Sequence, residues 1–148
     1  MNKIVIVGLC LVLVVTFSGC IGTPSFQEKK IDNLRVEINI DANETKNTSI
    51  STVKLIMEQK GYVVEEHYVN STLVGVYGNK LDPYHIFVSV LTNTSSPSIF
   101  YHQTYTINET QLEQEKQKIK TEIEDIGAHA NLTIDWNKAT WEIGYRTS

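Results

Sequence analysis

The chain has 148 residues, enough for one domain and too few for two of ordinary size. Its 13 Lys and Arg against 17 Asp and Glu give a formal net charge of −4, which lacks the basic excess of nucleic-acid-binding proteins. A composition with 41% hydrophobic and 20% charged residues excludes both a disordered polyelectrolyte and a membrane bundle. Both cysteines, Cys10 and Cys20, fall near the start of the chain, so the rest has no disulfide, thiolate zinc site or cysteine nucleophile.

The first 22 residues have the three-part pattern of an export signal. A short basic start is followed by the apolar run 4–17 and then by small residues. The run is shorter than the ~20 residues that a bilayer span needs. We therefore expect residues 1–19 to be an export signal.

The segment Phe17-Ser18-Gly19-Cys20 resembles the lipobox of prokaryotic lipoproteins, although that family usually has an aliphatic residue at the position of Phe17. The resemblance is limited to the leader and implies that Cys20 is lipidated and becomes the first residue after cleavage. Two lipid chains give lasting attachment to a membrane. Residues 20–30 then form the lipidated cysteine and a polar tether, and residues 31–148 form a single extracellular domain. In the alternative, Cys20 is incidental and the apolar run remains as an uncleaved N-terminal membrane anchor. Both the lipid anchor and the uncleaved anchor place the domain on the outer face of the cell membrane.

The acceptor pattern for N-glycosylation, Asn-x-Ser/Thr, is three times as frequent as chance predicts. The 11 Asn and 25 Ser and Thr residues would give about two matches at random. Six are present, at Asn43, Asn47, Asn70, Asn93, Asn108 and Asn131. These residues also cluster in turns, which is the alternative explanation for part of the excess. A lipobox together with many sequons resembles the surface lipoproteins of archaea.

The first half of the body predicts a strand, a helix and a hairpin. Residues 34–40 alternate apolar and polar side chains, as in a half-buried strand. Residues 49–60 have apolar side chains at helical spacing, and Gly61 is placed to end that helix. Residues 62–69 and 72–77 are rich in β-formers and are separated by Asn70-Ser71, which predicts a hairpin.

The second half predicts two more strands, a long helix and a final hairpin. Residues 84–91 are apolar at both parities, which indicates a central strand buried on both faces. The next strand has four apolar or aromatic residues on one face: Ile99, Tyr101, Tyr105 and Ile107. A helix over 108–126 follows, capped by Asn108 or Thr110 and ended by Gly127. It has a narrow apolar stripe, and the rest of its surface is polar and solvent-exposed.

The last segment predicts a hairpin around Asn137-Lys138. In that register Trp136 pairs with Ala139, Ile134 with Trp141, and Leu132 with Ile143, and Asn131 lies on the solvent face. The complete pattern predicts an α+β fold, with a mostly antiparallel sheet of about six to seven strands and two helices packed on one face.

The sequence lacks the strong motifs of nucleotide-binding, hydrolase and metalloprotease sites. The four histidines, His67, His85, His102 and His129, fall in predicted strands without metal-ligand spacing, so no metal and no cofactor is expected. Glu65 and His67 share one strand face and belong to the only local acid-base cluster; a solvated or salt-bridged sheet edge is the favoured explanation for them.

Trp136 and Trp141 lie on one face of the predicted hairpin. They could form an exposed stacking platform for a sugar or a partner, or belong to a core face that meets a helix. By elimination, the sequence favours a membrane-anchored extracellular module that binds a ligand, an envelope protein or a carbohydrate. The alternatives are an accessory subunit of a cell-envelope complex and a hydrolase of envelope polymers that would use Glu65 and His67.

Overall fold

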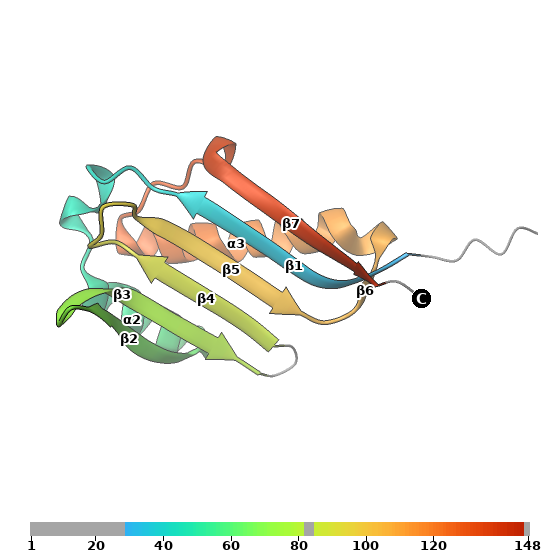
Figure 1. The fold of residues 1–148 in the computed structure, drawn as a ribbon, viewed down its shortest axis with the longest axis horizontal. Helices are drawn as coiled ribbons and strands as arrows, with labels where there is room; N and C mark the ends of the chain where they lie inside the picture. The colour runs from blue at the N-terminus through green and yellow to red at the C-terminus, as the bar shows by residue number, and fades with distance from the viewer. Residues whose placement is uncertain (1–28, 82–84, 147–148) are drawn as a thin grey trace, which may run out of the picture.

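The computed structural model describes residues 29–81 and 85–146, which form one twisted sheet with two helices on one of its faces (Figure 1). In chain order the elements are β1 (Lys30–Asn39), the 3-10 turn η1 (Glu44–Asn47), α2 (Ile50–Gln59), β2 (Val63–Val69), β3 (Thr72–Lys80), β4 (His85–Leu91), β5 (Ser98–Thr104), β6 (Ile107–Asn108), the 3-10 turn η2 (Glu109–Gln111), α3 (Leu112–Ala130), the 3-10 turn η3 (Trp136–Lys138) and β7 (Ala139–Arg146). The predicted α+β fold is confirmed, with seven strands where about six to seven were expected and with two helices on one face. The export signal, Cys20 and the tether up to residue 28 lie outside the described residues. Within the described ranges, neither helix is long and apolar enough to cross a membrane.

The strands are ordered β2-β3-β4-β5-β1-β7 across the sheet, and each pairs antiparallel to its neighbours. The short β6 also pairs with β1, at Lys30 and Ile31. We call the end of the sheet at which β1 begins the proximal end, and the end at which β1 finishes the distal end. Because all pairs are antiparallel, β3, β5 and β7 finish at the proximal end, whereas the β2–β3 turn and the β4–β5 loop lie at the distal end.

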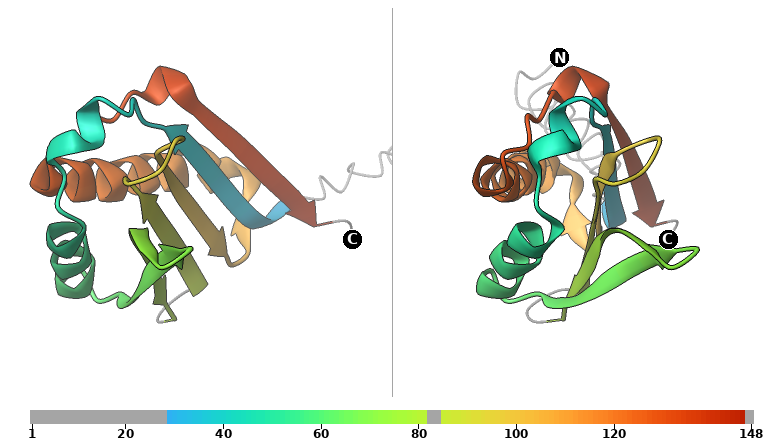
Figure 2. Two further views of the ribbon diagram at one scale, coloured as in Figure 1. Left: turned by 60° about the vertical axis from the view of Figure 1, so that its left-hand side comes forward. Right: turned by 90° about the vertical axis from the view of Figure 1, so that its left-hand side faces the viewer.

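The hydrophobic core lies between the sheet and the two helices (Figure 2). Alternate residues of the inner strands point into it, including Val36 of β1 and Val88 of β4, both fully buried. Ile119, Ile123 and Ile126 of α3 meet them at the spacing of one helix face. Burial of this kind contributes roughly 25 cal/mol per Å² of apolar surface, which makes the core the main source of stability.

The long helix extends further than the sequence predicted. Gly127 does not end α3; the helix continues to Ala130, and Asn131 caps it in the left-handed conformation with φ 55°. The backbone N–H of Leu132 then donates to the carbonyl of Gly127 at 2.8 Å. Gly127 serves packing instead, because a Cβ there would lie 2.8 Å from Cγ1 of Ile134.

The predicted final hairpin is wrong. Residues 131–135 form no strand, and β7 pairs with β1, placing Trp141 opposite Val36 and Ile143 opposite Leu34. The extension of α3 leaves too few residues for a first hairpin strand, while β1 offers a longer partner with the same alternation. Asp135 accepts a hydrogen bond from the backbone N–H of Asn137 and caps η3, which turns the chain into β7.

The β2–β3 hairpin and the interior position of β4 agree with the sequence, but the second face of β4 differs from the expectation. Val88 and Val90 are buried beneath the helices, whereas Phe87 and Leu91 are only half-buried on the opposite face. Within the described residues, no helix covers that opposite face (Figure 2). The apolar residues of β4 at the other parity therefore lie on an open surface.

Candidate functional site

A row of five rings crosses the helix-free face of the sheet. From β2 to β5 it consists of His67, Tyr77, Phe87, Phe100 and His102, and we call it the aromatic row. Neighbouring ring centroids lie 6.1, 6.1, 6.1 and 6.3 Å apart. These separations fall within the range of favourable aromatic pairs, so the rings hold one another in place.

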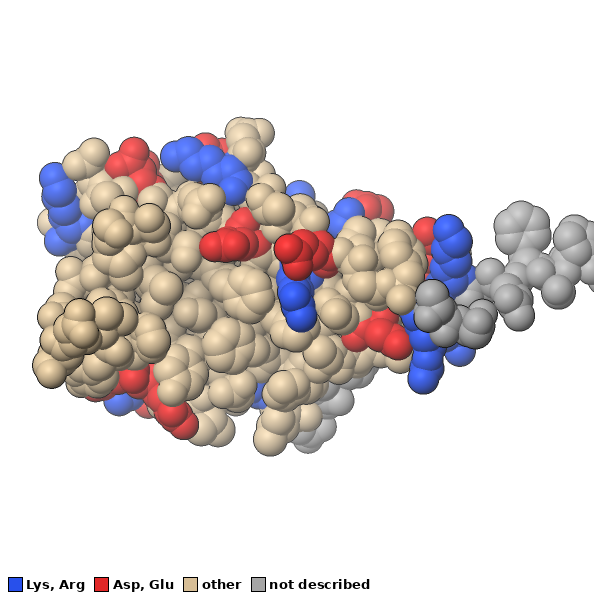
Figure 3. Space-filling model, viewed as in Figure 1, with Lys and Arg blue, Asp and Glu red and all other residues tan. Residues whose placement is uncertain are grey.

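The aromatic row contains no Lys, Arg, Asp or Glu and is bordered by polar groups. Figure 3 shows the same face: most of its surface carries no charged side chain, and a few Lys, Arg, Asp and Glu side chains lie at the margins and near the middle of the view. Arg35 of β1 pairs with Glu142 of β7 at 3.6 Å beside the end of the row. Burial, together with the positive charge of Arg35, lowers the pKa of His102, which keeps that imidazole neutral at pH 7.

Two nitrogen atoms at this end of the row lack a hydrogen-bond partner within the described structure. Nε of Arg35 and Nε2 of His102 are buried, and their residues face each other in the β1–β5 ladder. A buried nitrogen atom without a hydrogen-bond partner lowers the stability of the fold by about 1–3 kcal/mol, so a polar group that bonded to it would recover that energy.

Glu65 and His67 lie on this face, as the strand alternation predicted. The Tyr77 hydroxyl donates to Oε2 of Glu65 at 2.7 Å, which raises the pKa of Tyr77. The His67 ring meets the edge of the same tyrosine. Tyr77 thus joins the carboxylate of Glu65 to the aromatic row, of which His67 is the first ring.

Trp136 and Trp141 lie on the other face, beneath α3. Their rings stack at 6.3 Å and pack against the core. Lys116 lies over the ring of Trp141 at 5.7 Å and Lys120 over that of Trp136 at 5.4 Å, while Nε1 of Trp136 donates to Glu124 at 2.8 Å. Helix side chains thus occupy the ring surfaces that a sugar would need, so we do not centre the candidate site there.

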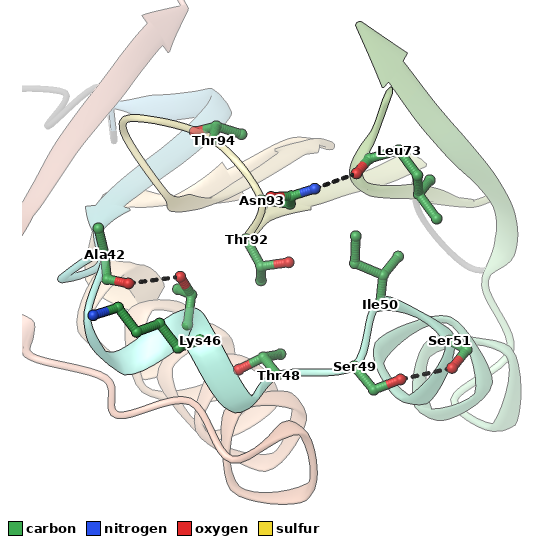
Figure 4. A pocket seen from close by; sticks show the side chains of 11 residues that line it. Ala42, Lys46, Thr48, Ser49, Ile50, Ser51, Leu73, Thr92, Asn93 and Thr94 are labelled. Carbon is green, nitrogen blue, oxygen red and sulfur yellow. Dashed lines mark hydrogen bonds between the residues drawn. The ribbon is translucent and has the colours of Figure 1, made fainter. Parts of the chain in front are cut away.

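A cavity of about 550 Å³ opens at the distal end (Figure 4). It lies between the η1–α2 segment and the β4–β5 loop, and six hydroxyl residues line it: Thr45, Thr48, Ser49, Ser51, Thr92 and Thr94. Its size suits a small ligand. However, Asn93 of a sequon belongs to its wall and Asn47 of another directly precedes Thr48. Sugar chains on these residues would crowd its opening.

A second polar cluster, between α3 and the sheet, was missed by sequence reasoning, which described this side of α3 as wet. Glu115 is only 7% exposed and accepts hydrogen bonds from Tyr105 and Lys118. Glu122 accepts from Tyr62 at 3.1 Å and from Lys60 at 3.3 Å. The spacing of Glu115 from Ile119 and Ile123 could have shown that it lies on the buried stripe. Because both carboxylates are partnered, the cluster joins α2, α3 and the sheet.

The histidines are dispersed. His67, His85 and His102 lie in strands as predicted, but His129 lies in α3, where it contacts Asp125 at 3.3 Å. Among residues 29–81 and 85–146, no three His, Cys, Asp or Glu side chains lie close enough to hold a metal ion.

Comparisons with protein-family models, curated proteins and solved structures find no match to this chain.

Proposed function

We propose that this protein is a lipid-anchored binding module on the outer face of the cell membrane, and that its partner docks on the helix-free face. The aromatic row is the observation that carries the proposal. An antiparallel sheet with one solvated face normally alternates apolar residues inward and polar residues outward. Here Tyr77, Phe87 and Phe100 point outward on three adjacent strands, and such continuous apolar patches mark interaction surfaces.

The chemistry of the face favours an uncharged partner that presents a flat surface. Flat rings bury area at low entropic cost, and the neutral His102 avoids the desolvation of a charge at the end of the row. Arg35, Glu65 and Ser89 supply hydrogen-bonding groups around the rings. A carbohydrate chain or the apolar surface of an envelope protein meets these requirements. The lipid anchor at Cys20 accounts for the attachment to the membrane, as the lipobox resemblance implies.

The test places a photo-crosslinking amino acid at Ser89, which lies in the centre of the helix-free face between Tyr77 and Phe100. A matched probe at Leu55 of α2, 55% exposed, reports on the helix layer. After irradiation of native membranes, we expect a discrete adduct from the Ser89 probe that the Leu55 probe does not form. The variant Phe100→Ser should reduce the yield of that adduct. Identical adducts from both probes, or none from Ser89, would refute the proposal.

A second candidate, an accessory subunit of an envelope complex, is favoured by the edge strand β2. Val63, Tyr68 and Val69 on this strand are 72%, 54% and 49% exposed. An apolar edge strand with free backbone groups is a template for pairing with another chain. A complex that is lost in the variant Val63→Lys/Val69→Lys, measured as native mass in detergent, would support this candidate; a monomeric native mass would exclude it.

A further inference from the structure

The six sequons are distributed unequally between the two ends of the sheet. Five lie in connections at the distal end: Asn43 and Asn47 at η1 after β1, Asn70 in the β2–β3 turn, Asn93 in the β4–β5 loop, and Asn131 at the end of α3 before β7. All five are exposed. Sequence spacing alone did not indicate this grouping, because these residues are spread over almost ninety positions of the chain.

Asn108 differs from the others in its place and its surroundings. It belongs to β6 at the proximal end, where it pairs with Lys30 at the beginning of β1. Its backbone N–H donates to the side chain of Gln111 at 3.1 Å, and the residue is half-buried. A bulky sugar chain needs an exposed asparagine, so this sequon is the least suited of the six.

The proximal end is also the end that the membrane anchor reaches. Residues 21–29 connect Cys20 to β1, and nine residues span at most about 32 Å even when fully extended. Lys29, Lys30 and Arg146 gather at this end, with Lys29 lying 5.8 Å from the centre of the Tyr145 ring. Lys, Arg and Tyr side chains suit the interface between a membrane and water, because each combines an apolar body with a polar tip.

We infer that N-linked sugars cap the distal end of the protein, away from the membrane, and leave the helix-free face bare. The inference rests on the proposed extracellular location. It assigns modification to Asn43, Asn47, Asn70, Asn93 and Asn131, and excludes Asn108. It also deepens the docking proposal, because none of the six acceptor residues belongs to the aromatic row or to the central part of β3, β4 or β5. Sugars of this protein protect its outer end while its partner approaches the sheet from the side.

Glycopeptide mapping of the full-length protein from its native membranes tests the cap. We expect attached sugars at the five distal sites and an unmodified Asn108. Occupancy of Asn108 equal to that of the distal sites, or no modification at any site, would overturn the inference. This result is independent of whether a partner docks on the aromatic row.

Moving a sequon onto the sheet tests the bare face. The double substitution Ser89→Asn/Leu91→Thr creates an acceptor site in the middle of β4, whereas Ser89→Gln/Leu91→Thr has a similar polarity without an acceptor. The variant Ala139→Ser completes an acceptor site at Asn137, in the connection that leads into β7 at the distal end. A cross-linking probe at Asn79, which pairs with Phe87 in the β3–β4 ladder and lies outside the aromatic row, reports docking in all three variants.

We expect the acceptor at Ser89 to be modified and to lower the adduct yield at least tenfold below that of the Gln control, while the distal acceptor keeps the yield within twofold of the parent. Equal adduct yields from the modified Ser89→Asn variant and its Gln control would show that docking does not require a helix-free face without sugars. If Asn108 carries a sugar while the adduct still forms, only the proposed distal position of the sugars is refuted. The same holds if the five distal sites carry no sugar. Loss of the adduct from the unmodified parent would refute only the docking proposal.

Discussion

The contact between Gly127 and Ile134 gives the sharpest test of how the chain continues after α3. A Cβ at Gly127 would lie 2.8 Å from Cγ1 and 3.0 Å from Cδ1 of Ile134, and 3.1 Å from the carbonyl oxygen of Leu132. In an exposed helix interior, Gly→Ala gains about 1 kcal/mol from helix propensity. Overpacking of this kind costs about 1–3 kcal/mol. The clash therefore outweighs the propensity, and Gly127→Ala should destabilise the domain by about 1 kcal/mol.

The effect of Gly127→Ala on stability should change sign when the side chain of Ile134 is shortened. Ile134→Ala alone removes part of the packing against α3 and costs about 2 kcal/mol. In that background Gly127→Ala no longer meets Cγ1 and should stabilise by up to about 1 kcal/mol, reduced by the remaining contact with Leu132. The expected coupling energy is about 1–3 kcal/mol.

Guanidinium denaturation of the four proteins, expressed without the leader and without glycosylation, measures this cycle. Two-state transitions with equal m-values are needed for the comparison. Additive effects, within about 0.5 kcal/mol, would show that Ile134 does not lie against Gly127. The path described for residues 131–135 would then be incorrect.

Three further predictions concern stability. Asn131→Gly relieves a left-handed asparagine at the end of α3 and should raise the stability of the unglycosylated domain by about 0.5–1 kcal/mol, measured by thermal denaturation; a decrease would contradict the cap geometry. The hydrogen bond from Lys60 lowers the pKa of Asp125 below its ordinary value of 3.8, so this pair contributes stability above that pH and loses it as the pH falls through the lowered value. Asp125→Asn should therefore flatten the acid limb of a stability–pH curve, and an unchanged limb would refute the role of the pair. Gly75→Ala should destabilise the domain by about 3 kcal/mol or more, because the new Cβ would lie 2.2 Å from the backbone oxygen of Val90. A backbone atom in a sheet cannot move aside as a side chain does. If the variant has the parental stability in urea denaturation, β3 and β4 lie further apart than described.

Local patterns were sufficient wherever one element's own residues decide its conformation. The alternation of Leu34, Val36 and Ile38 fixed β1, and Asn70-Ser71 fixed the β2–β3 turn, where both residues have positive φ. Gly61, with φ 86°, ended α2 as expected. Gly127 had the same signature at the predicted end of the long helix, but it lies inside α3, where the glycine is needed for close approach by Ile134. A glycine at a helix end has two uses, and only the neighbouring residues distinguish them.

The candidate site shows the same limit. The sequence indicated that Phe87 and Leu91 belong to an apolar second face of β4, and it interpreted that face as buried. Burial depends on what packs against a face, and both helices lie on the other side. Trp136 and Trp141 illustrate the converse. The sequence left open whether their rings are exposed for a ligand, and in the structure lysine side chains of α3 lie over both rings.

By itself, therefore, the sequence determined the α+β class, the two helices, the antiparallel pattern and the six glycosylation sequons, because these depend on residues close together in the chain. It also predicted the export signal and a lipid anchor at Cys20. Only the tertiary structure decided which sheet face remains open, how five rings from four strands align, which strand β7 joins and which end of the molecule carries five of the six sequons. Those features depend on contacts between distant segments, and a one-dimensional pattern does not specify which of several apolar faces will meet.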